Sequence, residues 1–212
     1  MAIKVNEIFH SIQGESSWSG QPCVFIRLTG CNLRCAYCDT SYAYEQGALM
    51  EIPEILERVG ELRCSLVEVT GGEPLLQADT PRLIVRLLNA GHTVLLETNG
   101  SLDIGVVDRR CVRIVDIKCP SSGMSGQNDL RNLEKLGAHD ELKFVIGTRE
   151  DYEFARRIIS SVPAARGRIN FSPVFGAVDP RLLAGWILED RLPVRLNLQL
   201  HKIIWGPEAT GV

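Results

Sequence analysis

Three cysteines, Cys31, Cys35 and Cys38, lie within residues 29–40, and Tyr37 immediately precedes the last of them. Thiolates are the usual protein ligands of iron–sulfur clusters, and a four-iron cluster normally takes four of them. A compact set of three leaves one iron free to bind something other than protein. The spacing therefore predicts a 4Fe-4S cluster with an open, reactive iron, and we call residues 29–40 the cluster loop.

The same thiols have two alternative uses, in a zinc site or in disulfides. A structural zinc ion needs four protein ligands, but His10 and His92 are far away in the sequence and no second Cys-x2-Cys pair exists. The total of seven cysteines is odd and the chain is not small, which argues against a disulfide framework. We expect the other four cysteines to be packing residues: Cys23, Cys64, Cys111 and Cys119.

Length and composition limit the class of protein. A chain of 212 residues with 45% apolar content can bury a full core, and we expect a single domain over 1–212. A net charge of −3, with acids and bases interspersed, gives no basic surface for nucleic acid or membrane lipids. The sequence shows no leader and no run of about eighteen apolar residues, so we expect a cytoplasmic protein that acts on a small molecule.

Two kinds of segment alternate along the chain. Short apolar, β-branched runs predict buried strands at 24–28, 66–70, 93–98, 112–117, 141–146, 168–171 and 194–198. Helical spacing predicts helices between them at 52–62, 81–90, 130–136, 151–160 and 180–188. Such alternation produces parallel sheets, so we expect an α/β fold: an open, TIM-like barrel of about six parallel strands, with helices outside and functional groups at the C-terminal strand ends.

The turn 70–74, which follows the second predicted strand, reads Thr-Gly-Gly-Glu-Pro. Glycine lets the backbone approach a ligand closely, and a glutamate accepts hydrogen bonds from an ammonium group. Such turns also occur without any ligand. Polar residues follow later strands as well, and we expect Ser121 and Ser172 to face the barrel mouth as cofactor contacts, with solvated loop residues as the alternative.

The cluster loop resembles the Cys-x3-Cys-x2-Cys signature of the radical S-adenosylmethionine (SAM) superfamily, with Tyr37 in the aromatic position. The resemblance implies that the open iron binds the methionine part of SAM and that one electron from the reduced cluster releases a 5'-deoxyadenosyl radical. It also implies that the turn 70–74 contacts the SAM amino group and that the cluster loop contacts the adenine. The implied SAM contacts are Tyr37, Cys38, Asp39, Gly72 and Glu73.

Four segments, 9–16, 25–28, 38–40 and 199–207, closely resemble the 7-carboxy-7-deazaguanine synthase family, and the likeness runs from end to end. That family contracts the ring of 6-carboxy-5,6,7,8-tetrahydropterin, with loss of ammonia, in queuosine and 7-deazapurine biosynthesis. The resemblance implies hydrogen abstraction from C6 of the pterin, regeneration of SAM, a flavodoxin or ferredoxin as electron donor, and a homodimer. The implied substrate contacts are Ile12, Gln13, Gly14, Glu15, Arg27, Thr70, His201 and Pro207.

The chemistry of these residues suits the implied roles. The carboxylate of Glu15 can accept from the amino and N–H edge of a pterin, and the guanidinium of Arg27 can bind a carboxylate with two hydrogen bonds. If Arg27 points inward it must meet a carboxylate, because an unpaired buried guanidinium is costly; otherwise it is an outward residue of a half-buried strand. The alternatives are a solvated loop acid for Glu15 and a packing histidine for His201, and we expect Trp205 in the core.

Thr40 matches a magnesium-binding hydroxyl of the family. Magnesium keeps several waters and combines few protein ligands with substrate oxygens, so a single threonine suffices only with substrate bound. In some relatives the chain ends at the residue matching Pro207, whereas here residues 208–212 follow. In this chain Pro207 offers only its carbonyl oxygen, or Glu208 substitutes for the missing carboxylate.

Two other functions use the same cluster loop. A glycyl-radical activase is a small radical SAM enzyme whose substrate is a protein, and the segment 13–15, Thr40 and His201 argue against it. An iron–sulfur or zinc redox sensor binds metal but neither SAM nor pterin, and it has no need of a turn like 70–74. We therefore expect an enzyme with a pterin substrate.

Overall fold

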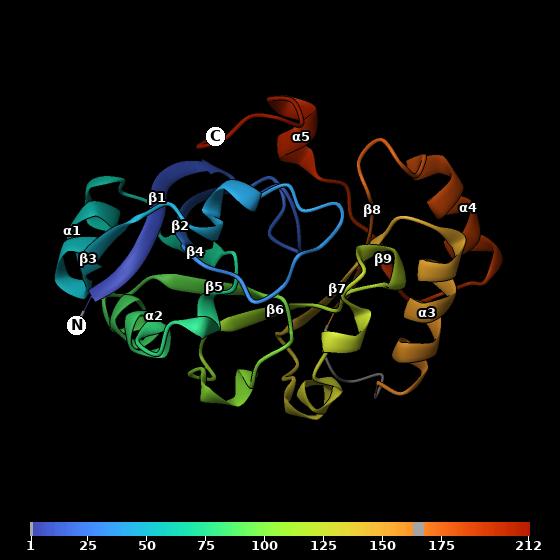
Figure 1. The fold of residues 1–212 in the computed structure, drawn as a ribbon, viewed down its shortest axis with the longest axis horizontal. Coiled ribbons are helices and arrows are strands. Elements are labelled where there is room, and N and C mark those ends of the chain that lie inside the picture. The colour runs from blue at the N-terminus through green and yellow to red at the C-terminus, as the bar shows by residue number, and fades with distance from the viewer. Residues whose placement is uncertain (1, 163–167) are drawn as a thin grey trace.

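The computed structural model describes residues 2–162 and 168–212. Its strands form one nine-stranded sheet in the order β3-β1-β2-β4-β5-β6-β7-β8-β9 (Figure 1). From β2 to β9 in this order neighbouring strands run parallel, whereas β1 and β3 are antiparallel to their neighbours. The strands are β1 (Ala2–Ile12), β2 (Pro22–Leu28), β3 (Ala48–Glu51), β4 (Leu66–Gly71), β5 (Thr93–Thr98), β6 (Val112–Asp116), β7 (Glu141–Ile146), β8 (Arg168–Pro173) and β9 (Arg195–Leu196).

Two pairs of helices cover one face of the sheet and bury two separate apolar clusters against it, whereas the short helix at 200–204 belongs to neither pair (Figure 1). The α-helices are α1 (Ile52–Glu61), α2 (Thr80–Asn89), α3 (Arg149–Ser160), α4 (Pro180–Glu189) and α5 (Leu200–Ile204). Short 3-10 helices span Ser41–Tyr44, Pro74–Leu76, Ile104–Val106, Pro120–Ser122, Ser125–Gln127 and Leu130–Lys135. In the described part of the chain, none of the helices is both long and apolar enough to cross a bilayer.

The predicted open α/β sheet is confirmed, and every parallel strand overlaps a predicted strand segment. The helix predicted at 130–136 is present over Leu130–Lys135, but it is a 3-10 helix rather than an α-helix. Asn132 there donates to the backbone oxygens of Gly100 and Leu102, which holds the segment as a tight 3-10 turn against the next loop. The sequence did not predict β1, β3 or α5, because β1 and β3 lack an apolar run and α5 is only five residues long.

Residues alternate between the two faces of the parallel strands. In β4, Val67 and Val69 are buried against the helices, whereas Leu66, Glu68 and Thr70 point to the opposite face, which we call the inner face. The inner face is apolar near the start of the strands and polar near their C-terminal ends. Of the cysteines expected to be packing residues, three are buried and Cys64 is half-buried.

A buried ion pair holds β6 near its N-terminal end. Arg113 is 4% exposed and Asp140 is fully buried. The guanidinium of Arg113 pairs with the carboxylate of Asp140, and Nη2 of Arg113 also donates to the backbone oxygen of Lys135 at 2.9 Å. The backbone N–H of Arg113 donates to Asp140 Oδ1 at 2.8 Å. The pair therefore joins β6 to the loop that precedes β7.

We expect Arg113→Ala to lower the free energy of unfolding by about 3–5 kcal/mol, because it leaves the carboxylate of Asp140 buried without its cation. The matched control is Arg181→Ala, whose side chain is 91% exposed and pairs with Asp179 at the surface. That control should have a much smaller effect, because exposed ion pairs contribute little to stability. Urea unfolding of the wild type and both variants under reducing conditions measures the two losses in free energy of unfolding. Equal losses would show that the buried pair contributes no more to stability than the surface pair.

Candidate active site

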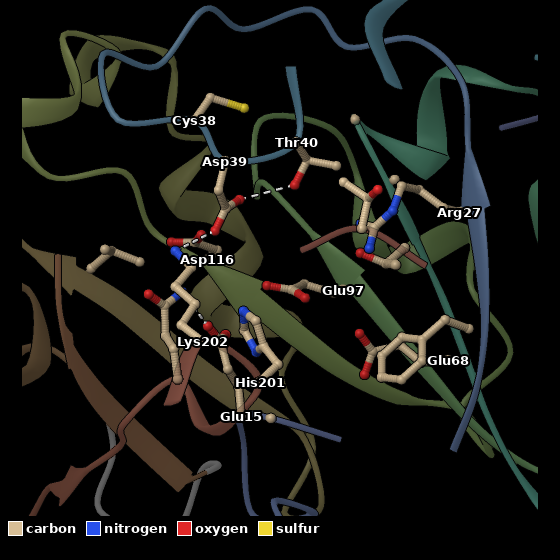
Figure 2. A pocket seen from close by; sticks show the side chains of 18 of the residues that line it. Glu15, Arg27, Cys38, Asp39, Thr40, Glu68, Glu97, Asp116, His201 and Lys202 are labelled. Carbon is tan, nitrogen blue, oxygen red and sulfur yellow. Dashed lines mark hydrogen bonds and ion pairs between the residues drawn. The ribbon is translucent and has the colours of Figure 1, made fainter. Parts of the chain in front are cut away.

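A pocket opens at the C-terminal ends of the parallel strands on the inner face of the sheet (Figure 2). The cluster loop forms one side, α5 and residues near the C-terminus form another, and the ends of β2, β4, β5, β6 and β7 form the floor. The structure brings most of the sequence-predicted site residues together here. Those that line the pocket are Ile12, Gln13, Gly14, Glu15, Arg27, Cys31, Cys35, Tyr37, Cys38, Asp39, Thr40, Thr70, Gly72, His201 and Pro207.

The three thiols of the cluster loop are free and half-buried, and all of them line this pocket. Sγ of Cys31 accepts hydrogen bonds from the backbone of Leu33 at 3.4 Å and from Nδ2 of Asn99 at 3.8 Å. Burial raises the pKa of the Cys31 and Cys35 thiols. In the ranges 2–162 and 168–212, no three His, Cys, Asp or Glu side chains are grouped to hold a single metal ion. Three thiols on one loop that face one pocket fit an iron–sulfur cluster.

The turn after β4 packs directly on the cluster loop. The backbone N–H of Glu73 donates to the oxygen of Gly30 at 2.7 Å. A Cβ on Gly72 would stand 2.2 Å from that same oxygen, so the close approach requires glycine. Glu73 itself is fully buried behind the pocket wall, where its carboxylate accepts from two backbone N–H groups and from the hydroxyl of Thr98. Of this pair only Gly72 reaches the pocket.

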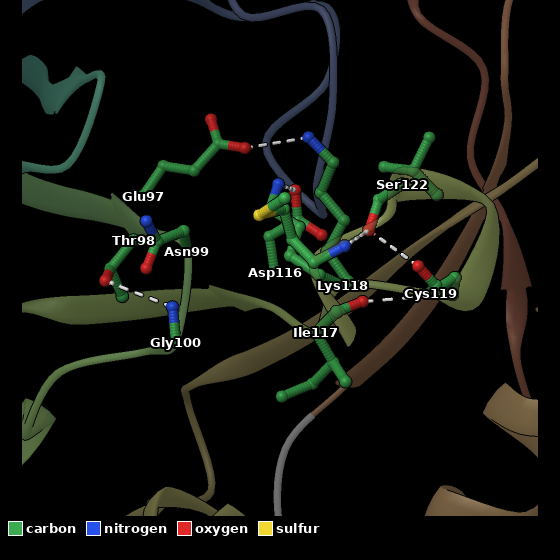
Figure 3. Close-up of polar contacts among 12 residues, drawn as sticks. Glu97, Thr98, Asn99, Gly100, Asp116, Ile117, Lys118, Cys119 and Ser122 are labelled. Atoms are coloured by element: carbon green, nitrogen blue, oxygen red, sulfur yellow. Dashed lines mark hydrogen bonds and ion pairs between the residues drawn. The ribbon is translucent and has the colours of Figure 1, made fainter. Parts of the chain in front are cut away.

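Six charged residues that are not among the predicted site residues also line the pocket: Glu68, Glu97, Asp116, Lys118, Lys143 and Lys202. Nζ of Lys143 pairs with Glu15 and, at 2.7 Å, with Glu97, while Nζ of Lys118 pairs with Asp116 at 2.7 Å. Figure 3 shows Glu97 and Asp116 at the ends of neighbouring strands. For Glu68, Asp116 and Lys143 the sequence holds a usable signal, a charged residue between two apolar residues of a strand segment. Because residues alternate between the faces of a strand, such a side chain lies on the face opposite its apolar neighbours.

Glu15 is held in the pocket wall by two partners. Oε2 of Glu15 pairs with Lys143, and Oε1 accepts from Nε2 of Gln199 at 2.6 Å. Burial raises the pKa of Glu15, but Lys143 outweighs it and the pKa is lowered, so the group is ionised at neutral pH. The alternative of a solvated loop acid is wrong, because Glu15 is only 8% exposed.

Helix α5 is docked onto the loop between β1 and β2. The backbone N–H of Leu200 donates to the oxygen of Gly14 at 2.9 Å. A Cβ on Gly14 would stand 2.2 Å from Nδ1 of His201, so the imidazole lies directly against this glycine. His201 is half-buried and lines the pocket, and burial lowers its pKa. The loop and the helix therefore form one continuous wall.

The side chain of Gln13 is occupied within the protein. Its Nε2 donates to Glu68, and its Oε1 accepts from the backbone of Glu15 at 3.0 Å. The backbone of Gln13 is also paired, with the oxygen of Gln21 and the N–H of Gly20, both at 2.8 Å. Gln13 thus shapes the loop that presents Glu15.

Arg27 points inward from β2 and meets a carboxylate, as inward placement requires. Its Nε donates to Oε1 of Glu7 at 2.7 Å, and the hydroxyl of Tyr42 donates to the same oxygen at 2.8 Å. The guanidinium lies over the rings of Phe9 and Tyr42, 5.7 and 5.8 Å from their centroids. Within the described residues its two Nη atoms form no ion pair or hydrogen bond, so they are free to face a ligand.

Asp39 and Thr40 lie where the cluster loop meets α5. Oδ2 of Asp39 pairs with Nζ of Lys202 at 2.6 Å, and Oδ1 accepts from the hydroxyl of Thr40 at 2.9 Å (Figure 2). Burial raises the pKa of Asp39, but Lys202 and these hydrogen bonds outweigh it, so the pKa lies well below its usual range. The neighbouring Tyr37 donates its hydroxyl to the oxygen of Val145 at 3.3 Å.

Comparison with known proteins decides the family. The model of the radical SAM superfamily matches residues 25–159. A 7-carboxy-7-deazaguanine synthase from Koribacter versatilis is 48% identical over 228 residues, which cover 99% of this chain and 100% of the relative. One from Chlorobaculum tepidum is 49% identical over 215 residues, which cover 99% and 97%. The chain belongs to the 7-carboxy-7-deazaguanine synthase family.

Solved structures show the same fold at lower identity. QueE from Escherichia coli has a TM-score of 0.73 at 22% identity, with 94% of each chain covered. SuiB from Streptococcus suis, bound to its precursor peptide SuiA, has a TM-score of 0.57 at 12% identity and covers 80% of this chain and 46% of its own. Membership of the synthase family rules out a redox sensor and a zinc protein as the identity of this chain.

Some predicted site residues of this synthase family member lie outside the pocket lining. Ser121 donates its hydroxyl and backbone N–H to Asp151, and Ser172 is fully buried with a hydroxyl that has no hydrogen-bond partner among the described residues. Glu208 is exposed and does not line the pocket, although 207 and 209–212 do. Trp205 is 39% exposed, so the expectation that it belongs to the core is wrong.

We expect His201 to titrate below the ordinary histidine pKa of about 6.5, because burial disfavours the imidazolium. The folded protein then binds fewer protons than the unfolded chain, so this group lowers stability as the pH falls through that range. NMR titration measures the pKa, with His201→Asn to assign the signal. Glu15→Gln should lower the pKa further, since Glu15 raises it; a value at or above 6.5 would contradict the burial.

Proposed function

We propose that this protein is the radical SAM enzyme that converts 6-carboxy-5,6,7,8-tetrahydropterin to 7-carboxy-7-deazaguanine with loss of ammonia, in queuosine and 7-deazapurine biosynthesis. One observation carries the proposal: the cluster-loop thiols and the polar groups suited to a carboxylated pterin, Glu15 and Arg27, line the same pocket. The names of its near full-length relatives support it. The chain acts as a single radical SAM domain.

Cys31, Cys35 and Cys38 would hold the 4Fe-4S cluster, and the loop around them would hold SAM. When bound, the cluster and SAM together supply the chemistry of hydrogen-atom abstraction. Tyr37 and the backbone of Cys38 and Asp39 would contact the adenine, and the backbone of Gly72 the amino group. Two other predicted contacts would act from behind the pocket wall, by bracing the elements that touch SAM: Glu73 and Ser121.

Glu15 and Arg27 would orient the pterin from two sides. The ionised Glu15, held by Lys143 and Gln199, would accept from the amino and N–H edge of the ring. Arg27, held through Nε by Glu7, would offer its two Nη atoms to the substrate carboxylate. The remaining substrate contacts would come from the backbone and side chains of Ile12, Gln13, Gly14, Thr70, His201 and Pro207.

Thr40 would bind Mg²⁺ together with oxygens of the bound substrate. Its hydroxyl already lies beside Asp39, and magnesium accepts few protein ligands when substrate and water complete its shell. The fuller proposal, taken from the family resemblance, includes a flavodoxin or ferredoxin as electron donor, a homodimer and a cytoplasmic location. By the same resemblance SAM is regenerated, and hydrogen leaves and returns to the pterin.

Turnover tests the function directly. The protein is purified without oxygen, reconstituted with iron and sulfide, and incubated with SAM, dithionite, Mg²⁺ and 6-carboxy-5,6,7,8-tetrahydropterin. Mass spectrometry should detect 7-carboxy-7-deazaguanine. Formation of 5'-deoxyadenosine without that product would reject the substrate, and no SAM cleavage by an intact cluster would reject the radical SAM chemistry for this chain.

We expect Arg27→Lys to raise KM for the pterin roughly tenfold to a hundredfold, because lysine can keep the ion pair with Glu7 but cannot offer two further donors to a carboxylate. The matched control is Arg181→Lys at a 91% exposed side chain, which should leave KM unchanged. SAM cleavage in the absence of pterin should be the same in all three proteins. An unchanged KM in Arg27→Lys would show that Arg27 does not bind the substrate.

A further inference from the structure

Among the described residues, Glu68 differs from the other acidic side chains of the pocket in having no cation as an ion-pair partner. The other carboxylates that line the pocket each pair with a lysine: Glu15 and Glu97 with Lys143, Asp116 with Lys118, and Asp39 with Lys202. Within the described ranges Glu68 forms no ion pair, and the side chain that hydrogen-bonds to its carboxyl group is the neutral amide of Gln13. Its role is therefore not explained by the charge pairing of the site.

The position of Glu68 makes its carboxyl group part of the pocket floor. It lies on β4 opposite Phe25 of β2, it is only 2% exposed, and Leu66 precedes it on the same face. Oε2 accepts from Gln13, whereas Oε1 forms no hydrogen bond within the part of the chain that is described. Figure 2 shows the carboxyl group turned into the space between Arg27 and Glu15.

The surroundings of Glu68 favour the protonated acid. Burial is the largest influence and raises its pKa, and the neighbouring carboxylates of Glu97 and Glu15 raise it further. Lys143 on β7 and Arg27 on β2 act in the opposite direction, but the pKa remains well above its ordinary value. A protonated carboxyl group has an O–H donor as well as an acceptor oxygen. Glu68 therefore offers a neutral hydrogen-bond donor on the pocket floor.

We propose that Glu68 contacts the substrate, donating a hydrogen bond from its carboxylic acid to an acceptor atom of the bound heterocycle. The inference rests on the proposed function and adds a contact to it. A pterin ring carries acceptor atoms, its ring carbonyl oxygen and imino nitrogens, beside the donor edge that suits Glu15. A buried acceptor without a partner weakens binding, so a donor on the floor between Glu15 and Arg27 completes the recognition.

Two substitutions test whether Glu68 acts on the substrate as a neutral carboxylic acid or as an ionised carboxylate. Glu68→Gln keeps an oxygen that accepts from Gln13 and an N–H that donates into the pocket, whereas Glu68→Leu removes both. Affinity for 6-carboxy-5,6,7,8-tetrahydropterin is measured by calorimetry on the reconstituted enzyme with SAM and without reductant. We expect Glu68→Gln to bind within about threefold of the wild type and Glu68→Leu to bind about tenfold more weakly.

Infrared difference spectra provide a readout that a purely structural role would not produce. Addition of the pterin to the wild type should shift the C=O band of a protonated carboxyl group, and this change should be absent in Glu68→Gln. A missing shift in a wild type that binds the pterin would overturn the proposal, because Glu68 would then act only through Gln13. This test also stands if Glu68→Leu fails to fold.

Two binding results would also overturn the proposal. Wild-type affinity in Glu68→Leu would show that no contact exists, and a Glu68→Gln variant as weak as Glu68→Leu would show that an ionised carboxylate is needed. Failure of the proposed function looks different, because the wild-type protein itself would neither bind nor convert the pterin.

Discussion

The pocket depends on one buried lysine. Lys143 places its ammonium group between Glu15 and Glu97, and all three side chains lie in the pocket wall. Removing the cation from a buried carboxylate typically costs about 3–5 kcal/mol, so the buried Glu15 needs such a partner to stay ionised inside the protein. Burial lowers the pKa of Lys143, but the carboxylates around it outweigh this effect and raise it well above the ordinary value.

Lys143 connects elements that are distant in the sequence. Glu15 belongs to the loop after β1, Glu97 is the penultimate residue of β5, and Lys143 is in the middle of β7. The loop that carries Glu15 is bonded in turn to α5, through Gln199 and through the oxygen of Gly14. From α5, Lys202 reaches Asp39 in the cluster loop. The proposed pterin and SAM sites are therefore built on one connected set of charges and hydrogen bonds.

Much of this architecture could be predicted from the sequence because it is local. The apolar runs of the parallel strands and the spacing of the three cysteines are each contained in a few residues. The antiparallel strand β1 was not predicted, because its half-buried polar residues give it no apolar run. Its pairing with β2 extends the sheet beyond the predicted barrel and brings Glu7 to Arg27.

The charged residues of the pocket floor were harder to predict, because the role of each depends on an ion-pair partner that is distant in the sequence. Lys143 stands between Leu142 and Phe144 in the sequence, and nothing local indicates that its partners are Glu15 and Glu97. Glu73 illustrates the reverse case. The turn around it was recognised, but its carboxylate is used to join the ends of β4 and β5 and does not reach the pocket.

The most direct test of this account is the Lys143→Met variant, compared with Lys135→Met, which removes a half-exposed lysine paired with Asp103 at the surface. Product formation from the pterin and slow SAM cleavage without it are measured on both reconstituted proteins. We predict that Lys143→Met keeps its cluster and cleaves SAM but forms no 7-carboxy-7-deazaguanine, while Lys135→Met behaves as the wild type. Product formation by Lys143→Met at the wild-type rate would show that the pocket does not depend on this lysine.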